Sequence, residues 1–376
     1  MRIQALLTDS IHNVMGGMGE QLRNNLNHIS DKYHFDIIGH CEFGGEFTGK
    51  NYSFKSIEGL LKIYATKVDP LFYPFLNQNS FIKKSFEYPK PDIIHSFDWS
   101  TFMPSMFLAD YYKIPLITTI QLSINELVKS YNIDINASPL YQLHKAIEIE
   151  GMHKSNAIIQ VSNNYAKKSS SFFWNKTFVI ENGIDLNLWK KQNDIKLPGG
   201  NKYKIIYIGR LEYQKNIQTL IDIKLPSNVD LIIIGGHKGS AAELVQKVIN
   251  RSEKDKNFIY VGPKYNQEKI DMLFSADAVI MPSIHEPFGI VALEALASNN
   301  ILLSSFVDGM GDFLTEDVAI NCGITKESIE SAIDAFINLT EENKRKRINK
   351  GLEICRNYSW QKSAQKIEQV YNLFEN

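Results

Sequence analysis

The second half of the chain alternates short apolar runs with helical segments, and this alternation restricts the fold more than any other feature. Five β-branched runs occur, at residues 204–209 (KIIYIG), 229–235 (VDLIIIG), 257–262 (NFIYVG), 278–283 (AVIMPS) and 301–304 (ILLS). Their continuous apolar character is typical of strands covered on both faces of a parallel sheet. Helices are predicted between them, at 216–224, 241–251, 267–275 and 288–297. The pattern predicts a doubly wound α/β domain.

The first half repeats this pattern less regularly. Strands are predicted at 2–7, 35–40, 92–97, 115–120, 157–162 and 177–182, whereas the aromatic-rich segment 43–88 is poorly periodic and receives no assignment. A polar stretch at 187–203, with Pro198, Gly199 and Gly200, predicts a linker between two domains. A chain of 376 residues is long enough for two cores. Two α/β domains joined in this way normally bind their ligand in the cleft between them.

The composition excludes several classes of protein. The formal net charge is −1, so no global field attracts nucleic acid or an anionic membrane. No uncharged apolar stretch reaches the roughly 18 residues of a membrane-spanning helix, and MRIQALLTDS lacks the apolar core of a signal peptide. A cytoplasmic location without an integral membrane segment is therefore expected. Three scattered cysteines match neither a disulfide framework nor a zinc site, so no metal is implied.

The segment 282–297, PSIHEPFGIVALEALA, carries the strongest functional signal. Glu286 and Glu294 lie eight positions apart, a spacing that returns a helical side chain to nearly the same face. The backbone N–H groups of Phe288, Gly289 and Ile290 are expected to open the helix, where donors and the positive end of the dipole favour a diphosphate. The two carboxylates can accept hydrogen bonds from sugar hydroxyls. The alternative is an amphipathic helix with one exposed acid and one cap.

A second signal follows the first strand of the second domain. In GRLEYQKN, at residues 209–216, Arg210 and Lys215 lie five positions apart between a strand and a helix, where they can converge on one anion. Arginine supplies a planar fork and lysine a point charge, a suitable pair for a diphosphate. The alternative is two unrelated surface cations.

A glycine pair, Gly16 and Gly17, follows the first strand and leads into a predicted helix at 21–29. Glycines there let the backbone approach a sugar or a phosphate, although a plain tight turn explains them equally well. Residues 308–312, DGMGD, form a second glycine-rich turn after a strand.

Taken together, these segments resemble the glycogen and starch synthase-like retaining glycosyltransferases of the GT-B fold. The resemblance runs in order through GGMGE (16–20), IHSFDW (94–99), IIQVSNNYAKK (158–168), IENGID (180–185), GRLEYQKN (209–216), PSIHEPFGIVALEAL (282–296) and SWQKSAQKIEQVY (359–371). It implies two Rossmann-like domains facing a central cleft: an acceptor-side domain at 1–186 and a nucleotide-sugar-binding domain at 187–358. A helix at 359–376 would cross back onto the first domain.

The resemblance also implies an activity. The family transfers a hexose from a nucleotide-diphosphate sugar to a carbohydrate, with retention of the anomeric configuration and without a metal or other cofactor. Glucose and a UDP- or ADP-sugar donor are the first expectations. The absence of an Asp-x-Asp signature at a strand edge agrees with metal-free transfer.

Roles for individual residues follow from the same resemblance. Arg210 and Lys215 would neutralise the diphosphate as it leaves, Glu286 would bind the donor sugar, and Glu294 would bind the ribose hydroxyls. Further donor contacts are implied for Gly16, Gly17, Tyr265, Phe288, Gly289 and Ile290. Of these, Tyr265 would stack on the base, and the three residues that follow Glu286 and Pro287 would offer backbone N–H groups.

The chain departs from the family pattern in its first half. Ser100 and Gln121 stand where relatives usually carry histidines, and the lysine common before the glycine pair is replaced by Val14 or Met15. The amide of Gln121 can still offer an oxygen and N–H groups, so it remains a candidate catalytic residue. His95, at a strand end, is interpreted as a packed, hydrogen-bonded residue.

Two alternatives to the hexosyltransferase stay open. One is a sugar-nucleotide-binding or scaffold protein that has lost transfer, as Ser100 and Gln121 suggest. The other is a transferase whose acceptor is a lipid-linked or protein-linked glycan. Aromatic residues of the acceptor side, Tyr64, Phe72, Tyr73 and Phe75, could stack on sugar rings, although core packing explains them equally well. The linkage and the oligomeric state are not readable from the sequence.

Overall fold

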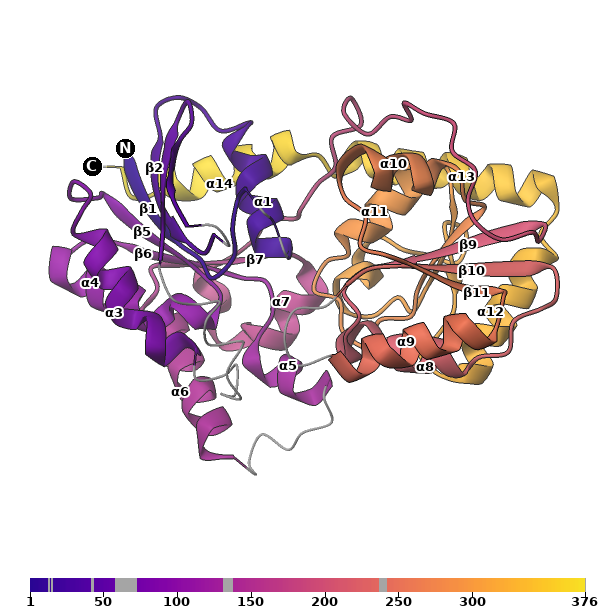
Figure 1. Cartoon of the computed structure of the whole chain (residues 1–376). Helices are drawn as coiled ribbons and strands as arrows, with labels where there is room; N and C mark the ends of the chain where they lie inside the picture. Colours follow the sequence, from indigo (N-terminus) through magenta and orange to yellow (C-terminus); the bar gives the residue numbers. More distant parts are fainter. Residues whose placement is uncertain are drawn as a thin grey trace. The chain divides into compact units, whose positions relative to one another are not determined.

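The computed structural model describes residues 1–12, 14, 16–41, 44–57, 73–130, 138–236 and 242–375. The chain divides into two compact units (Figure 1). Unit 1 comprises Met1–Asn182 together with Trp360–Asn376, and unit 2 comprises Gly183–Ser359. No helix in the described ranges is long and apolar enough to cross a membrane.

Unit 1 is built on an eight-stranded sheet in the order β3-β4-β2-β1-β5-β6-β7-β8. Its strands are β1 (Arg2–Leu6), β2 (His34–Gly39), β3 (Glu46–Thr48), β4 (Tyr52–Ser56), β5 (Ile93–Phe97), β6 (Leu116–Ile120), β7 (Ala157–Gln160) and β8 (Thr177–Val179). All neighbours are parallel except β3 and β4. The six strands predicted in this half are present. β3 and β4 lie in the unassigned segment, because their residues show little apolar periodicity.

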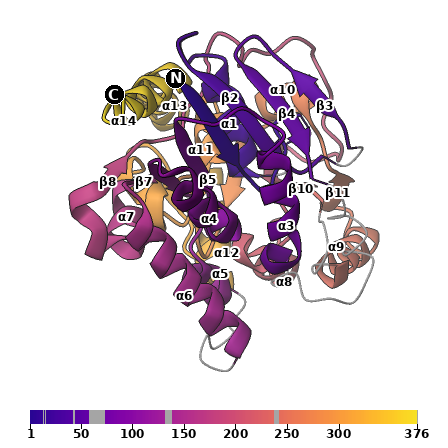
Figure 2. The same ribbon diagram turned by 90° about the vertical axis from the view of Figure 1, so that its left-hand side faces the viewer.

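Helices surround this sheet (Figure 2). They are α1 (Gly17–Leu26), α3 (Tyr73–Ser85), α4 (Phe102–Tyr112), α5 (Ile124–Ser130), α6 (Pro139–Lys154), α7 (Asn163–Ser169) and α14 (Trp360–Asn372), with 3-10 turns η2 (Trp99–Thr101) and η4 (Ser171–Lys176). The helix predicted at 21–29 begins four residues earlier, at Gly17, directly on the glycine pair.

The last helix, α14, packs on unit 1 and not on the unit that precedes it in sequence. Its apolar face enters the core of unit 1 with Ile367, Val370 and Tyr371. The Tyr371 hydroxyl lies 2.6 Å from Nδ1 of His95, whose Nε2 lies 2.7 Å from Oγ1 of Thr119. Burial lowers the pKa of His95 to about 3, so the imidazole is neutral. His95 is thus a packed, hydrogen-bonded residue, as predicted.

Unit 2 contains a six-stranded parallel sheet in the order β11-β10-β9-β12-β13-β14. The strands are β9 (Tyr203–Ile208), β10 (Val229–Ile234), β11 (Phe258–Gly262), β12 (Ala278–Met281), β13 (Ile301–Ser304) and β14 (Ile320–Asn321). The five predicted strands are present within two residues. β14 has two residues, too few to give a sequence pattern.

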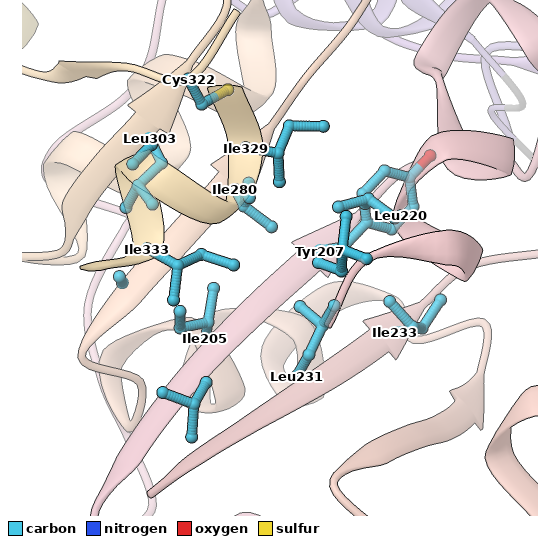
Figure 3. Packing of buried hydrophobic residues seen from close by; sticks show 14 of the residues in the cluster. Ile205, Tyr207, Leu220, Leu231, Ile233, Ile280, Leu303, Cys322, Ile329 and Ile333 are labelled. Atoms are coloured by element: carbon cyan, nitrogen blue, oxygen red, sulfur yellow. The ribbon is translucent and has the colours of Figure 1, made fainter. Parts of the chain in front are cut away.

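The helices of unit 2 are α8 (Ile217–Asp222), α9 (Ala242–Lys254), α10 (Asn266–Phe274), α11 (Ile290–Ala297), α12 (Lys326–Ile337) and α13 (Glu341–Asn357), with 3-10 turns η5 (Tyr213–Lys215) and η6 (Asp308–Asp312). Figure 3 shows part of the core, in which Ile205 and Ile280 from the sheet lie close to Ile333 and Ile329 of α12. Such continuous burial explains why these strands lack a polar face.

Both units are Rossmann-like, and each has a topological switch point. In unit 2 the chain leaves β9 for β10 on one side and reaches β12 on the other, and in unit 1 it leaves β1 for β2 and later reaches β5. Ligands of open parallel sheets bind beside the carboxyl ends of strands at such points. In unit 2 the predicted cations follow β9 and Glu286 follows β12. In unit 1 the glycine pair follows β1.

Candidate functional site

The fold of unit 2 brings Lys215 and Glu286 together. They are 71 positions apart in sequence, but β9 and β12 are hydrogen-bonded neighbours, so the loops that follow these strands meet at one edge of the sheet. Lys215 Nζ donates to Glu286 Oε2, and the two side chains are only 19% and 11% exposed. Two further bonds tie the loops: Ile284 N to Gln214 O at 2.9 Å, and Gln214 Nε2 to His285 O at 3.2 Å.

The helix after Glu286 starts later than the sequence predicts. α11 begins at Ile290, and Gly289 is its N-cap with φ 103° and ψ 55°. Because Gly289 is left-handed, the helix cannot include Phe288, so the predicted start was wrong by two residues. Glu286 therefore lies in the loop, and helical periodicity does not relate it to Glu294. Ile290 is the first helical residue, and its N–H belongs to the open helix end.

The second glycine-rich turn, η6, packs against the Glu286 loop. Asp308 Oδ2 accepts a hydrogen bond from the backbone N–H of Glu286 at 3.0 Å and lies 3.4 Å from His285 Nδ1. Gly309 N donates to Glu286 O at 3.0 Å, and a Cβ on Gly309 would lie 2.0 Å from Pro287 O. Only glycine permits this approach, so the turn fixes the backbone on both sides of Glu286.

Glu294 lies inside α11 and is buried, with 5% of its surface exposed. Its Oε1 accepts from Lys269 Nζ of α10 at 2.6 Å. The same ammonium lies 5.0 Å from the ring of Trp189, whose Nε1 donates to Ser298 Oγ at 2.7 Å. The carboxylate is thus held by a cation that α10 supplies. Lys269 was not predicted, because no sequence spacing relates α10 to α11.

Arg210 and Tyr265 lie at the same carboxyl edge but are exposed. Arg210 follows β9, and its Nη1 donates to Glu212 Oε1 at 2.9 Å. The buried hydroxyl of Tyr207 donates to the Arg210 carbonyl at 2.8 Å, and burial raises the pKa of this phenol. Tyr265, the N-cap of α10 after β11, is 65% exposed. A side chain this open can stack on a planar ligand without displacing any core residue.

In unit 1, Asp9 organises the glycine pair. Its Oδ2 accepts hydrogen bonds from Gly16 N and Gly19 N, both at 3.0 Å, and its Oδ1 accepts from Ser10 N at 2.8 Å. A Cβ on Gly19 would lie 2.8 Å from this carboxylate and 2.3 Å from Ser10 O. The Asp9 carboxylate therefore fixes the first turn of α1 through the backbone N–H groups of Gly16 and Gly19. Sequence analysis missed Asp9, which lies seven residues before the glycines.

Gln121 follows β6 and contacts the same glycine-rich turn. Its Nε2 donates to Gln21 Oε1 at 2.7 Å, and its Oε1 lies 3.1 Å from the position that a Gly17 Cβ would take. Gln21 is 1% exposed, and its own Nε2 has no hydrogen-bond partner in the described part of the chain. An amide couple thus occupies the position where the family pattern has an imidazole. Gln21 was also missed, since a lone glutamine in a helix gives no signal.

Asp98 fixes the backbone of Gln121. Its Oδ1 accepts from Gln121 N at 2.5 Å and from Leu122 N at 3.2 Å. Burial raises the pKa of Asp98 to about 7, although these two N–H groups act in the opposite direction. Asp98 has φ 59°, a conformation that costs an aspartate on the order of 1–3 kcal/mol. Ser100, two residues later, lies 3.0 Å from Thr8 Oγ1 and links the ends of β5 and β1.

Behind this edge lies a second buried acid, Glu148 of α6. Its Oε1 accepts from Ile124 N at 3.0 Å, and burial raises its pKa to about 8, with smaller contributions from Asp98 and Glu126. Tyr165 accepts from Ser123 N at 2.7 Å, which fixes the chain two residues after Gln121. Beside Asp9, the polar edge of unit 1 therefore holds the amides of Gln21 and Gln121 and two buried acids, Asp98 and Glu148, whose pKa values are raised.

No group of three His, Cys, Asp or Glu side chains in the described ranges could hold a metal ion. Of the aromatic residues proposed for the acceptor, Phe75 packs 5.0 Å from the ring of His144. Tyr64 and Phe72, and the side chain of Tyr73, lie outside the described residues. Of the residues predicted to be catalytic or to contact the donor, the glycine pair and Gln121 belong to unit 1, and the others belong to unit 2.

The comparisons with known proteins agree with this architecture. Residues 15–188 match the model of glycosyltransferase family 4, and residues 190–353 match that of the glycosyl transferases group 1. A glycogen synthase of Mycobacterium tuberculosis is 24% identical over 387 residues, an alignment that covers 95% of this chain and 91% of that protein.

Two solved structures share the fold. Sucrose-phosphate synthase from Thermosynechococcus elongatus has a TM-score of 0.80 at 19% identity, covering 99% of this chain and 98% of that chain. Anabaena Alr3699/HepE in complex with UDP-glucose has a TM-score of 0.71 at 15% identity, covering 99% of both chains. Two Rossmann-like units and these matches define a glycosyltransferase of the GT-B fold. Within that fold, the comparisons support a glycosyltransferase of the glycogen synthase-like type.

Proposed function

We propose that this chain transfers a hexose, with glucose as the first candidate, from a UDP- or ADP-sugar to a hydroxyl of a carbohydrate acceptor. Transfer proceeds with retention of the anomeric configuration and without a metal. The bond between the anomeric carbon and the diphosphate breaks, and a bond to the acceptor oxygen forms. The proton of the acceptor hydroxyl leaves with the diphosphate. We also propose that the protein acts in the cytoplasm.

The observation that carries the proposal is the partly buried pair of Lys215 and Glu286 at the switch point of unit 2. Removing two charges from most of their water is unfavourable, so such a pair at the carboxyl edge of a sheet needs a reason beyond stability. A diphosphate supplies one, since it can take over Lys215 while the sugar hydroxyls donate to Glu286. We assign Arg210 to the same diphosphate, because it extends from the end of β9 and is exposed.

The remaining donor contacts are assigned to the residues around this pair. The backbone N–H groups of Phe288, Gly289 and Ile290 are offered to sugar and phosphate at the start of α11. Glu294 is assigned to the ribose hydroxyls, which would share the carboxylate with Lys269. Tyr265 is assigned to the base.

From unit 1 we assign three residues to the sugar side of the donor: Gly16, Gly17 and Gln121. The glycines leave the backbone accessible, and the Gln121 amide lies directly beside Gly17. An amide can hydrogen-bond a hydroxyl but cannot carry a positive charge at neutral pH, unlike the imidazole of the family pattern. Gln121 would therefore orient the sugar without stabilising charge.

Release of nucleoside diphosphate from UDP-, ADP- and GDP-sugars by the purified chain, with glucose oligomers as acceptors, tests the proposal. Release from one donor, lost in Glu286→Gln and in Lys215→Ala, supports it. The matched control Lys247→Ala removes a surface lysine that is paired with Glu243 at 2.6 Å and should leave release unchanged. Release that persists undiminished in both site variants would overturn the assignment of these residues.

A second candidate is a sugar-nucleotide-binding protein without transfer, favoured by Ser100 and Gln121 in unit 1. It predicts that one nucleotide sugar raises the melting temperature while no diphosphate is released with any acceptor. A third candidate keeps transfer but uses a lipid-linked or protein-linked glycan. Adding such acceptors to a donor that binds but is not cleaved distinguishes the last two.

A further inference from the structure

The turn η4 of unit 1, with the sequence SFFWNK, exposes two large aromatic side chains. Phe172 is 97% exposed and Trp174 is 49% exposed. Single apolar residues on a surface need no explanation, but two aromatics in one six-residue turn form a local apolar tip. The turn connects α7 to β8, which is the edge strand of the sheet.

Hydrogen bonds and packing hold the turn that exposes this tip. Lys176 Nζ donates to the carbonyls of His153 and Ser155, both at 2.7 Å, and so fastens the turn to the end of α6. The Thr177 hydroxyl donates to Phe173 O at 2.8 Å. Phe173 packs against a buried cluster of unit 1, and the Lys176 ammonium lies 5.3 Å from its ring. The middle aromatic therefore anchors the turn while its two neighbours remain in water.

The tip lies in a stretch of sequence, between Glu150 and Glu181, that carries lysines and no acid. Residues 151–180 contain Lys154, Lys167, Lys168 and Lys176 and neither aspartate nor glutamate. Lys167, on the exposed side of α7, makes no ion pair with any described residue. Lys168 is 2.6 Å from Glu126, and Lys154 is 3.9 Å from Glu150. Of these four lysines, Lys167 and Lys176 are the two that make no ion pair with a described acid, and they supply the unpaired positive charge of this stretch.

We propose that the η4 turn docks unit 1 onto an anionic lipid surface. Tryptophan and phenylalanine beside lysines are the combination that favours the interface of a bilayer, where the rings enter the headgroup region and the ammonium groups meet lipid charges. Two side chains offer far less than the roughly 800 Å² per partner of a stable protein interface, which favours a membrane over a protein.

The position of the turn leaves the candidate site accessible. β7 and β8 are parallel, so η4, which precedes β8, lies at the amino edge of the sheet. Gly17 and Gln121 follow β1 and β6 and belong to the opposite, carboxyl edge. A docked unit 1 therefore keeps its ligand edge away from the lipid contact, and changes in the tip should leave sugar-nucleotide binding unaffected. The proposal does not depend on the transferase activity.

The test is co-sedimentation of the full chain with vesicles of phosphatidylcholine alone or mixed with phosphatidylglycerol. Binding is expected on the mixed vesicles only and should weaken as salt is added. Phe172→Ser with Trp174→Ser should lower the partition coefficient by about tenfold or more, and Lys167→Glu should lower it by a smaller factor. Leu188→Ser, which changes a residue of unit 2 that is 71% exposed, is the matched control.

A blue shift of tryptophan emission on vesicles that Trp174→Phe abolishes would locate the contact directly. The proposal is overturned if the unaltered chain ignores anionic vesicles, or if the double variant binds them as well as the unaltered chain. It is also overturned if light scattering shows that the tip variants lose a dimer without any change in vesicle binding, because the tip would then contact a second copy.

Discussion

The carboxyl edges of the two sheets differ in the charge of their polar side chains. In unit 2, each predicted glutamate is held by a lysine from another element: Glu286 by Lys215 and Glu294 by Lys269. In unit 1, the corresponding edge holds the neutral couple of Gln21 and Gln121 above the buried Asp98. On the proposed assignment, unit 2 would receive the diphosphate and unit 1 the neutral hydroxyl groups of the sugar. The departures from the family pattern, Ser100 and Gln121, both lie in unit 1, whereas the residues assigned to the diphosphate lie in unit 2.

The largest effect is expected from Lys215→Ala. On the proposed assignment, the diphosphate that develops charge in the transition state loses the Lys215 ammonium, so turnover should fall by about 10²- to 10³-fold. The measurement is kcat for diphosphate release with the donor that the purified chain cleaves. A fall in kcat of less than about threefold would contradict the assignment of the diphosphate to Lys215 in unit 2.

The pH dependence of stability should differ between the units. The pKa values of Asp98 and Glu148 in unit 1 are raised to about 7 and about 8 by burial. The folded state then binds more protons than the unfolded chain between about pH 4 and pH 8, so the free energy of unfolding falls as the pH rises through this window. In unit 2, hydrogen bonds lower the pKa of Asp271 and of Asp317 to about 2, so their contribution is lost as the pH falls below about 4.

Urea unfolding of the full chain between pH 5 and pH 8.5 measures the decline expected from the two acids of unit 1. The combined variant Asp98→Asn with Glu148→Gln should flatten the decline at high pH, because the amides cannot ionise. Asp110→Asn, which changes an exposed acid of α4, should leave the decline as it is. A decline of equal slope in the combined variant would show that other groups cause it.

Gly289→Ala should destabilise the start of α11 by about 2 kcal/mol. The alanine must adopt φ 103°, which strains its backbone. Its Cβ would also lie 2.7 Å from Met310 Cγ, which overpacks the site. Gly200→Ala, at a position with open space around the added atom, should leave the free energy of unfolding unchanged. Equal stability of the two variants would mean that the Glu286 loop tolerates the change.

The smallest effect is expected from the amide couple. Gln121→Leu and Gln21→Leu should each reduce turnover by about tenfold, which corresponds to one lost hydrogen bond. Because Gln21 acts through Gln121, the double variant should be no slower than the Gln121 variant, and the KM for the donor should change little. Asn25→Leu, a buried amide one turn along α1, is the control for folding. Additive losses would show that Gln21 has a separate role.

Much of the fold could be predicted from the sequence. The apolar runs 204–209 and 278–283 could be recognised as strands because both faces of the sheet are covered. Strands buried on both faces have continuously apolar sequences. The order of the motifs around Arg210, Lys215 and Glu286 likewise indicated a donor site after two strands. β3, β4 and β14 were not predicted, because they are short or lack periodicity.

What the sequence determined, then, is the number and type of the domains and a set of candidate donor-site residues, since local patterns and motif order carry that information. The tertiary structure decided which of those residues meet: Lys215 with Glu286 across neighbouring strands, Lys269 with Glu294 across two helices, and Gln21 with Gln121 across 100 positions. Such pairs depend on strand order and helix packing, which no spacing along the chain encodes. Asp9 and Gln21 were not predicted for the same reason, because their contacts depend on the tertiary structure.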